Sequence, residues 1–290
     1  MSASEPTRQH DENQVNTSHP PTATTQSSAG FAAATQPITH QTVIRTDTVG
    51  LEDGRIDLDV HGQSVPLYYA QPAGKSSLPV VLVVSEIFGL HEHIMDVARR
   101  FAKLGYLAVA PEMFVRQGDA SQYQTVPELL KEIIYKVPDA QVMGDLDAVL
   151  AWAGQHGGDL SRAGVTGFCW GGRITWLYAA HNPSIKAGVA WYGRLTGTAT
   201  TLTPHHPLDV AASLTTPVLG LYGANDASIP VASIREMESA LAQGSSQSAF
   251  NVYATSGHAF HADYRASYVE ADAKDGWTRC VQWLSANGVA

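Results

Sequence analysis

Cys169 stands in a glycine-rich segment whose spacing suits covalent chemistry. Residues 167–172 read Gly-Phe-Cys-Trp-Gly-Gly, with glycines two positions before and two after the cysteine. A tight turn from a strand into a helix needs this spacing, because Cβ atoms there would collide with neighbouring segments. The sulfur would be exposed beside a helix N-terminus, whose partial positive charge favours a thiolate. We therefore predict a nucleophilic cysteine; a buried structural cysteine in a glycine-rich turn is the alternative.

An acid and a base follow Cys169 along the chain. Asp226 comes directly after the apolar run at 217–222 and precedes Pro230, where a carboxylate could orient an imidazole. His258 stands on a glycine turn just past the run at 250–254 and is the predicted base. Capping of the helix that begins near Pro230 is the alternative role for Asp226, and a structural role is the alternative for His258.

Glu86 is the fourth candidate, because it follows the apolar run at 79–85. A carboxylate at the end of a buried strand is costly without a purpose, and pairing with an arginine is the structural alternative. The loop that begins here corresponds to one that supplies an oxyanion N–H, for which Ile87 is the candidate. The backbone N–H of Trp170, next to the cysteine, is predicted to be the other donor.

Composition limits the classes of partner. The chain has 290 residues, 44% of them hydrophobic, and a formal net charge of −9 without a basic patch, which argues against nucleic-acid and membrane surfaces. The chain has only two cysteines, Cys169 and Cys280, and so low a number fits a reducing compartment. Residues 1–40 contain no apolar core resembling a signal peptide, and no apolar run of 18 residues appears in the sequence. We expect a cytoplasmic protein without cofactor or metal that acts on a small molecule, as a monomer or weak homodimer.

The pattern along the chain predicts a single α/β domain at 41–290 after a disordered N-terminal tail at 1–40, which is rich in Ser, Thr, Gln and Pro. An antiparallel pair at 55–60 and 64–71 opens the domain. Short apolar runs then alternate with segments of helical periodicity, which implies a mainly parallel sheet. The predicted strands are 78–85, 106–110, 163–168, 187–191, 217–222 and 250–254, and the helices are 93–104, 138–155, 172–180, 231–243 and 266–284.

Over residues 45–290 the chain closely resembles the dienelactone hydrolase (carboxymethylenebutenolidase) family, a cysteine branch of the α/β-hydrolases. Five motifs carry the resemblance: Glu-Ile-Phe-Gly at 86–89, Ala-Pro-Glu-Met-Phe at 110–114 with Arg116, the cysteine segment at 167–172, Gly-Ala-Asn-Asp at 223–226, and Gly-His-Ala-Phe at 257–260. The resemblance implies an α/β-hydrolase fold with helices on both faces of the sheet, and a carboxylic-ester hydrolase.

The resemblance also implies roles for the site residues. Cys169 would be the nucleophile, His258 its base and later proton donor, and Asp226 the group that orients His258. Glu86 would take the thiol proton when substrate binds, and the N–H groups of Ile87 and Trp170 would hold the oxyanion. A thioester would form and water would hydrolyse it, with no metal required.

The substrate is less well specified by the resemblance. The family's dienelactone enzymes bind the substrate carboxylate with two arginines, one of which is matched by Arg116. The other position is occupied by Ala262, so half of the clamp is missing, and His261 or Arg265 could compensate. A surface ion pair is the alternative role for Arg116.

Three other functions stay open. A general small-ester or thioester esterase would use the same four residues. A metal-dependent hydrolase would use the histidine clusters at 91–93 and 205–206, joined in space by His261, but histidines two apart do not share a helix face. A redox sensor would use Cys169 alone, and would need neither Asp226 nor His258.

Overall fold

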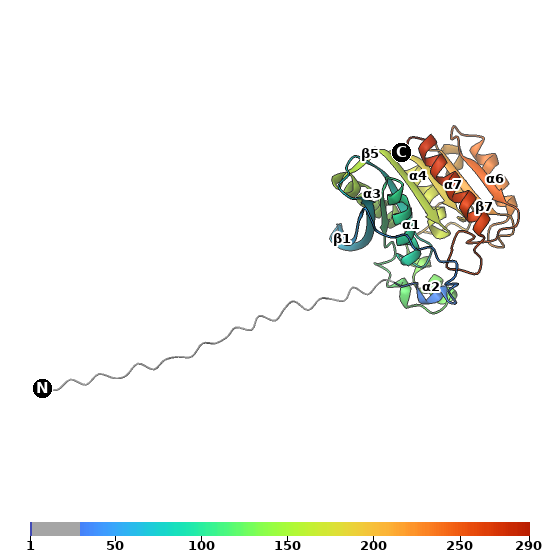
Figure 1. The fold of residues 1–290 in the computed structure, drawn as a ribbon. Coiled ribbons are helices and arrows are strands. Elements are labelled where there is room, and N and C mark those ends of the chain that lie inside the picture. Colours follow the sequence, from blue (N-terminus) through green and yellow to red (C-terminus); the bar gives the residue numbers. More distant parts are fainter. Residues whose placement is uncertain (2–29) are drawn as a thin grey trace.

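The computed structural model describes residue 1 and residues 30–290, which form one sheet with helices on both faces (Figure 1). The strands are β1 (Leu51–Val60), β2 (Gln63–Pro72), β3 (Leu78–Val84), β4 (Leu107–Pro111), β5 (Gly158–Phe168), β6 (Ile185–Trp191), β7 (Val218–Gly223) and β8 (Ala249–Tyr253). They form an eight-stranded sheet in the order β1-β2-β4-β3-β5-β6-β7-β8. The β1/β2 and β2/β4 pairs are antiparallel, and every other pair is parallel. The predicted fold class is therefore confirmed.

Seven α-helices are present in the described part of the chain: α1 (Glu92–Lys103), α2 (Val126–Glu132), α3 (Asp139–Gln155), α4 (Trp170–His181), α5 (Pro207–Val210), α6 (Val231–Leu241) and α7 (Glu270–Ala286). Short 3-10 helices occur at η1 (Ala33–Thr35), η2 (Ala120–Gln122), η3 (Ile134–Lys136) and η4 (Ala211–Ser213). The two short helices α2 and α5 fall in segments that the sequence pattern left unassigned. The last helix begins at Glu270 rather than at the predicted residue 266.

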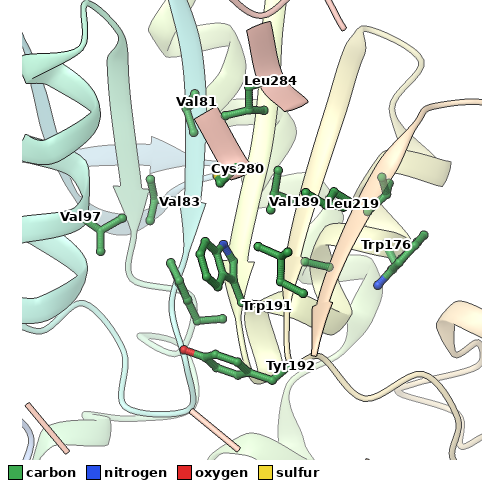
Figure 2. Packing of buried hydrophobic residues seen from close by; sticks show 14 of the residues in the cluster. Val81, Val83, Val97, Trp176, Val189, Trp191, Tyr192, Leu219, Cys280 and Leu284 are labelled. Atoms are coloured by element: carbon green, nitrogen blue, oxygen red, sulfur yellow. The ribbon is translucent and has the colours of Figure 1, made fainter. Parts of the chain in front are cut away.

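Two hydrophobic clusters fill the two sides of the sheet. Every residue of β3 is buried, as expected for a parallel strand covered on both faces. Val81 and Val83 belong to the cluster beneath α1 and α7, whereas their neighbours Val80 and Leu82 belong to the cluster beneath α3. Figure 2 shows Cys280 of α7 among the side chains of the α1/α7 cluster.

The two cysteines are separate and free. Cys280 is fully buried, and burial raises the pKa of its thiol, so it stays a neutral core side chain. Cys169 is partly exposed. The structure therefore leaves Cys169 as the cysteine available for chemistry.

The N-terminal boundary differs from the prediction. Residues 2–29 of the predicted tail lie outside the described residues, but residues 30–40 pack against the domain. Ala32 and Thr35 are buried, and the Thr39 N–H donates to the Tyr264 carbonyl at 2.9 Å. The Phe31 ring packs 4.9 Å from that of Tyr264. The predicted tail has a polar composition when residues 1–40 are taken together, so the contacts made by residues 30–40 were missed.

Among the residues that the structure describes, no helix is long and apolar enough to cross a membrane.

Candidate active site

Cys169 lies at a strained turn between β5 and α4. Its φ of 54° and ψ of −111° belong to a region that residues with a side chain rarely adopt, and such strain persists only where the surroundings enforce it. The Cys169 N–H donates to the Trp191 carbonyl at 3.0 Å. A Cβ at Gly172 would lie 2.5 Å from that same carbonyl oxygen, and one at Gly171 would lie 2.6 Å from the Ser85 carbonyl oxygen. The glycines therefore allow the turn to pack directly on neighbouring backbone, as the spacing predicted.

The other predicted residues follow strands at the same edge of the sheet. β3 and β5 are hydrogen-bonded parallel neighbours, and so are β7 and β8. Glu86 and Cys169 come just after the first pair, and Asp226 and His258 come just after the second. Carboxyl ends of parallel strands meet at one edge, which brings residues far apart in sequence into one region.

His258 and Asp226 form a close pair. Nδ1 of His258 lies 2.6 Å from the Asp226 carboxylate, whose side chain is fully buried. Asp226 also accepts the Ser228 N–H at 2.8 Å, so its second oxygen is engaged as well. This leaves Nε2 of His258 to face a reacting group, as a base oriented by a carboxylate requires.

The charges around His258 favour its protonated form. Burial by itself would lower its pKa, but the negative charge of Cys169 and the hydrogen bond to Asp226 outweigh burial and raise the pKa from 6.5 to about 10. Because the pKa of His258 is higher in the folded state than in the unfolded state, protonation of this ring stabilises the fold. That contribution to folding stability is complete below pH 6.5 and is lost as the pH rises through about 10.

We predict that Asp226→Asn lowers the pKa of His258, because the neutral amide no longer stabilises the imidazolium. The measurement is an NMR titration of the His258 ring in both proteins. The wild-type midpoint should lie near 10 and the variant midpoint clearly below it. Equal midpoints would show that Asp226 does not stabilise the charged ring.

The two predicted oxyanion donors are free in the described structure. Trp170 is the first residue of α4, and its N–H has no acceptor there, as for any first-turn residue. Ile87 follows β3, and its N–H likewise has no partner among the described residues. Two free backbone N–H groups, one at the turn containing Cys169 and one at the neighbouring loop, could hold a developing oxyanion.

Glu86 is buried, but its carboxylate is occupied by groups other than the thiol. His91 Nε2 lies 3.0 Å from Oε2, and the Tyr264 hydroxyl donates to Oε1 at 3.3 Å. Burial alone would raise the pKa of Glu86, but the hydrogen bond and charge of His91, followed by the charge of His93, lower it to about 2. The carboxylate is therefore a firmly held anion in this conformation.

His91, Tyr264 and Tyr192 are site residues that sequence reasoning missed. His91 was considered only as a metal ligand, although the buried Glu86 carboxylate, five positions before it, requires a polar partner. The Tyr192 ring packs 5.2 Å from that of His258, and its buried hydroxyl has no partner among the described residues. Burial, together with the charges of Glu86 and Cys169, raises the pKa of Tyr192 well above 10, so it stays a neutral donor.

The two arginines considered for a substrate carboxylate have different surroundings. Arg116 forms an ion pair with Asp145 and a hydrogen bond to Gln63, which is the alternative role considered from the sequence. The Arg265 guanidinium lies 5.5 Å from the centre of the Phe88 ring and has no hydrogen bond or ion pair among the described residues. Of the two, Arg265 is the free cation.

The histidine clusters do not form a metal site in the described part of the chain. His261 does lie near His93, with 5.6 Å between ring centres, but His93 pairs with Asp263 at 3.2 Å. His206 instead lies 3.4 Å from the Arg173 guanidinium. Among residue 1 and residues 30–290 no group of three or more His, Cys, Asp or Glu side chains is placed to hold a metal ion.

Comparison with known proteins gives consistent results. A sequence model of the "Dienelactone hydrolase family" matches residues 65–287. A "Putative carboxymethylenebutenolidase" from Methylorubrum extorquens is 55% identical over 262 residues, which cover 90% of each chain. A protein of the same name from Salmonella typhimurium is 50% identical over 266 residues, covering 91% of this chain and 98% of that one. A crystal structure of a "Putative Dienelactone Hydrolase" from Klebsiella pneumoniae superposes with a TM-score of 0.80 at 53% identity, covering 81% of this chain and 98% of the other.

Proposed function

The chain belongs to the dienelactone hydrolase family of carboxylic-ester hydrolases, and from that premise we propose that it opens a lactone or cleaves a small ester through a thioester on Cys169. The observation that carries this proposal is the strained turn holding Cys169 beside a His258 that is itself bound to Asp226 at 2.6 Å. A nucleophile, its base and the group that orients the base thus stand in one region.

In the proposed reaction His258, whose raised pKa favours the imidazolium, carries on Nε2 the proton that leaves the Cys169 thiol. The thiolate then forms a bond to the carbonyl carbon, and the carbonyl electron pair moves to oxygen, where the N–H groups of Ile87 and Trp170 stabilise it. Collapse of this tetrahedral species breaks the ester C–O bond, and His258 returns its proton to the leaving alkoxide. In a lactone the alkoxide stays attached to the acyl group.

Hydrolysis of the thioester completes the proposed cycle. His258 takes a proton from water as the water oxygen attacks the thioester carbon, and the second tetrahedral species expels the Cys169 thiolate. The products are a carboxylic acid and an alcohol, or a hydroxy acid or its keto form from a lactone, and the enzyme returns to its starting charge state.

For the substrate we propose a lactone that bears a carboxylate, held by Arg265. Its guanidinium has no partner among the described residues, and it lies over Phe88, which follows the proposed oxyanion residue Ile87. Arg116, the anchor expected from the resemblance, is already engaged by Asp145. A charged hydrogen bond from Arg265 would therefore cost no existing pair.

The test compares cis-dienelactone, which bears a carboxylate, with a neutral aryl acetate. In Arg265→Gln we expect KM for dienelactone to rise roughly tenfold or more, because a hydrogen bond between charged groups is lost. KM for the aryl acetate should change little. Arg116→Gln is the matched comparison. If Arg116→Gln raises KM for dienelactone selectively and Arg265→Gln does not, then Arg116 binds the substrate carboxylate.

Hydrolysis of the aryl acetate without any dienelactone turnover would favour the second candidate function, a general small-ester or thioester esterase with the same catalytic residues. The missing arginine at Ala262 is the feature that favours that function. The cytoplasmic location and the monomeric or weakly dimeric state expected from the sequence stay predictions.

A further inference from the structure

A cavity opens between α1 and α7 on one face of the sheet. Its volume is about 370 Å³, within the range of about 300–1,000 Å³ that small-molecule sites occupy. Arg100 of α1 borders it on one side and Trp277 of α7 on the other. The described residues that border it include neither Cys169 nor His258 nor any other residue assigned to the reaction. The cavity is therefore a different site from the one that contains Cys169.

His261 contributes a buried polar side chain to the wall of this cavity. The residue is only 2% exposed, its Nδ1 is enclosed, and its ring has no hydrogen-bond partner among the described residues. Burial, followed by the charges of His93 and Arg100, lowers the pKa of His261 well below 6.5, so the ring is neutral at pH 7. A neutral imidazole has one donor and one acceptor nitrogen, and leaving them unpaired in a buried position is costly. A molecule in the cavity that bonds to this ring would remove part of that cost.

Aromatic packing holds the His261 ring in its place at the cavity wall. The ring centres of Trp191 and Phe168 lie 4.5 Å and 5.1 Å from that of His261, and the Trp277 ring lies 6.2 Å away in a stacked arrangement. The imidazole is therefore not free to turn toward another partner. A polar group that is fixed before binding loses little conformational freedom when a ligand arrives.

The cations beside the cavity are already paired with carboxylates. Arg100 lies 2.6 Å from Asp96 and 2.5 Å from Asp263, and Lys274 lies 2.5 Å from Glu270. An anion would have to compete with these carboxylates for the same positive charges. The charge distribution therefore favours a neutral ligand.

Most of the remaining wall is apolar or aromatic. Ile44, from the segment before β1, and Ala273 and Trp277 of α7 border the cavity together with Tyr268. Aromatic rings pack well against other aromatic rings and gain more than the burial of their area alone. The shape of the best ligand is therefore a flat ring.

We propose that this cavity binds a small neutral aromatic molecule that carries a hydroxyl group, with its ring beside Trp277 and its hydroxyl bonded to the His261 imidazole. The hydroxyl can both donate and accept, so it suits either tautomer of the ring. The proposal is independent of the reaction at Cys169, because it rests on residues that the reaction does not use.

The test titrates the full-length protein with phenol and follows the backbone amide and indole N–H signals of Trp277 by NMR. We expect saturable shifts at Trp277 and at the Ala273 amide with a Kd of roughly 1 mM, because so small a molecule has few atoms that can contribute to binding. Anisole, in which a methyl group replaces the hydroxyl hydrogen, should bind more weakly than phenol. Benzoate, which is charged, should also bind more weakly.

Two variants separate the hydrogen bond from the cavity itself. His261→Phe keeps a ring and removes its nitrogens, so it should weaken phenol binding roughly threefold to tenfold and change anisole binding little. Thr278→Phe places a ring at an exposed position of α7 that borders the cavity, and should weaken binding of both probes. Ser239→Phe on α6 is the matched control, since Ser239 and Thr278 are both exposed and each donates its hydroxyl to the carbonyl four residues earlier. Circular dichroism checks that each variant is folded.

Three results would overturn the proposal. The first is a wild-type protein whose Trp277 signals show no saturable shift with phenol. The second is equal weakening of phenol and anisole in His261→Phe, which would show that His261 only packs against the ligand. The third is tighter binding of benzoate than of phenol. Should His261→Phe fail to fold, the phenol and anisole affinities of the wild type test the hydrogen bond, and Thr278→Phe against Ser239→Phe tests the cavity.

Discussion

Replacing Cys169 by alanine is expected to reduce kcat for an aryl acetate on the order of 10⁴-fold or more, since loss of a nucleophile leaves only binding and oxyanion stabilisation. The fold should persist, because the side chain is partly exposed and the turn is held by backbone contacts. Steady-state kinetics and a thermal melt measure the two effects.

Cys280→Ala is the matched control. This variant removes the sulfur of the other cysteine, which is fully buried on α7. It should lower the free energy of unfolding by about 1 kcal/mol and leave kcat unchanged. Equal activity of wild type and Cys169→Ala would remove Cys169 from the mechanism, whatever the control shows.

His258→Ala is expected to reduce kcat on the order of 10³- to 10⁴-fold, the range for loss of a general acid–base group. The loss should exceed that of Asp226→Asn, because the asparagine variant keeps an imidazole beside Cys169. Added imidazole should restore part of the activity by occupying the space left by the ring. The measurement is kcat with and without imidazole.

His181→Ala provides the comparison for His258. This histidine is the last residue of α4, its side chain is 42% exposed, and it pairs with Asp147 away from the strand ends that hold the site. Its removal should leave kcat and KM as in wild type. A His258→Ala variant as active as His181→Ala would show that another group deprotonates the thiol.

The elements around the site could be predicted because their patterns are local. Buried runs such as β3 have no polar residues, and the glycine spacing around Cys169 permits one kind of turn. Chain order then places Asp226 and His258 after the last two strands of the sheet, where parallel strands bring them together.

The surroundings of Glu86 could not be predicted in the same way. Its partner Tyr264 is far away in sequence, and which tyrosine faces a carboxylate depends on how the loop after His258 folds. The ordered segment around Phe31 was missed for a similar reason: it adjoins the polar tail, and only its contact with Tyr264 shows what it packs on. Arg116 and Arg265 show that residue type alone does not tell a free cation from a paired one.

The most direct test of the central claim is mass spectrometry of the protein quenched in acid during turnover of an aryl acetate. We predict a single acetyl group on the peptide that contains Cys169, removable by hydroxylamine as expected for a thioester, and absent from Cys169→Ala. Turnover without an acyl adduct under single-turnover conditions, or an adduct on any other residue, would contradict a mechanism through Cys169.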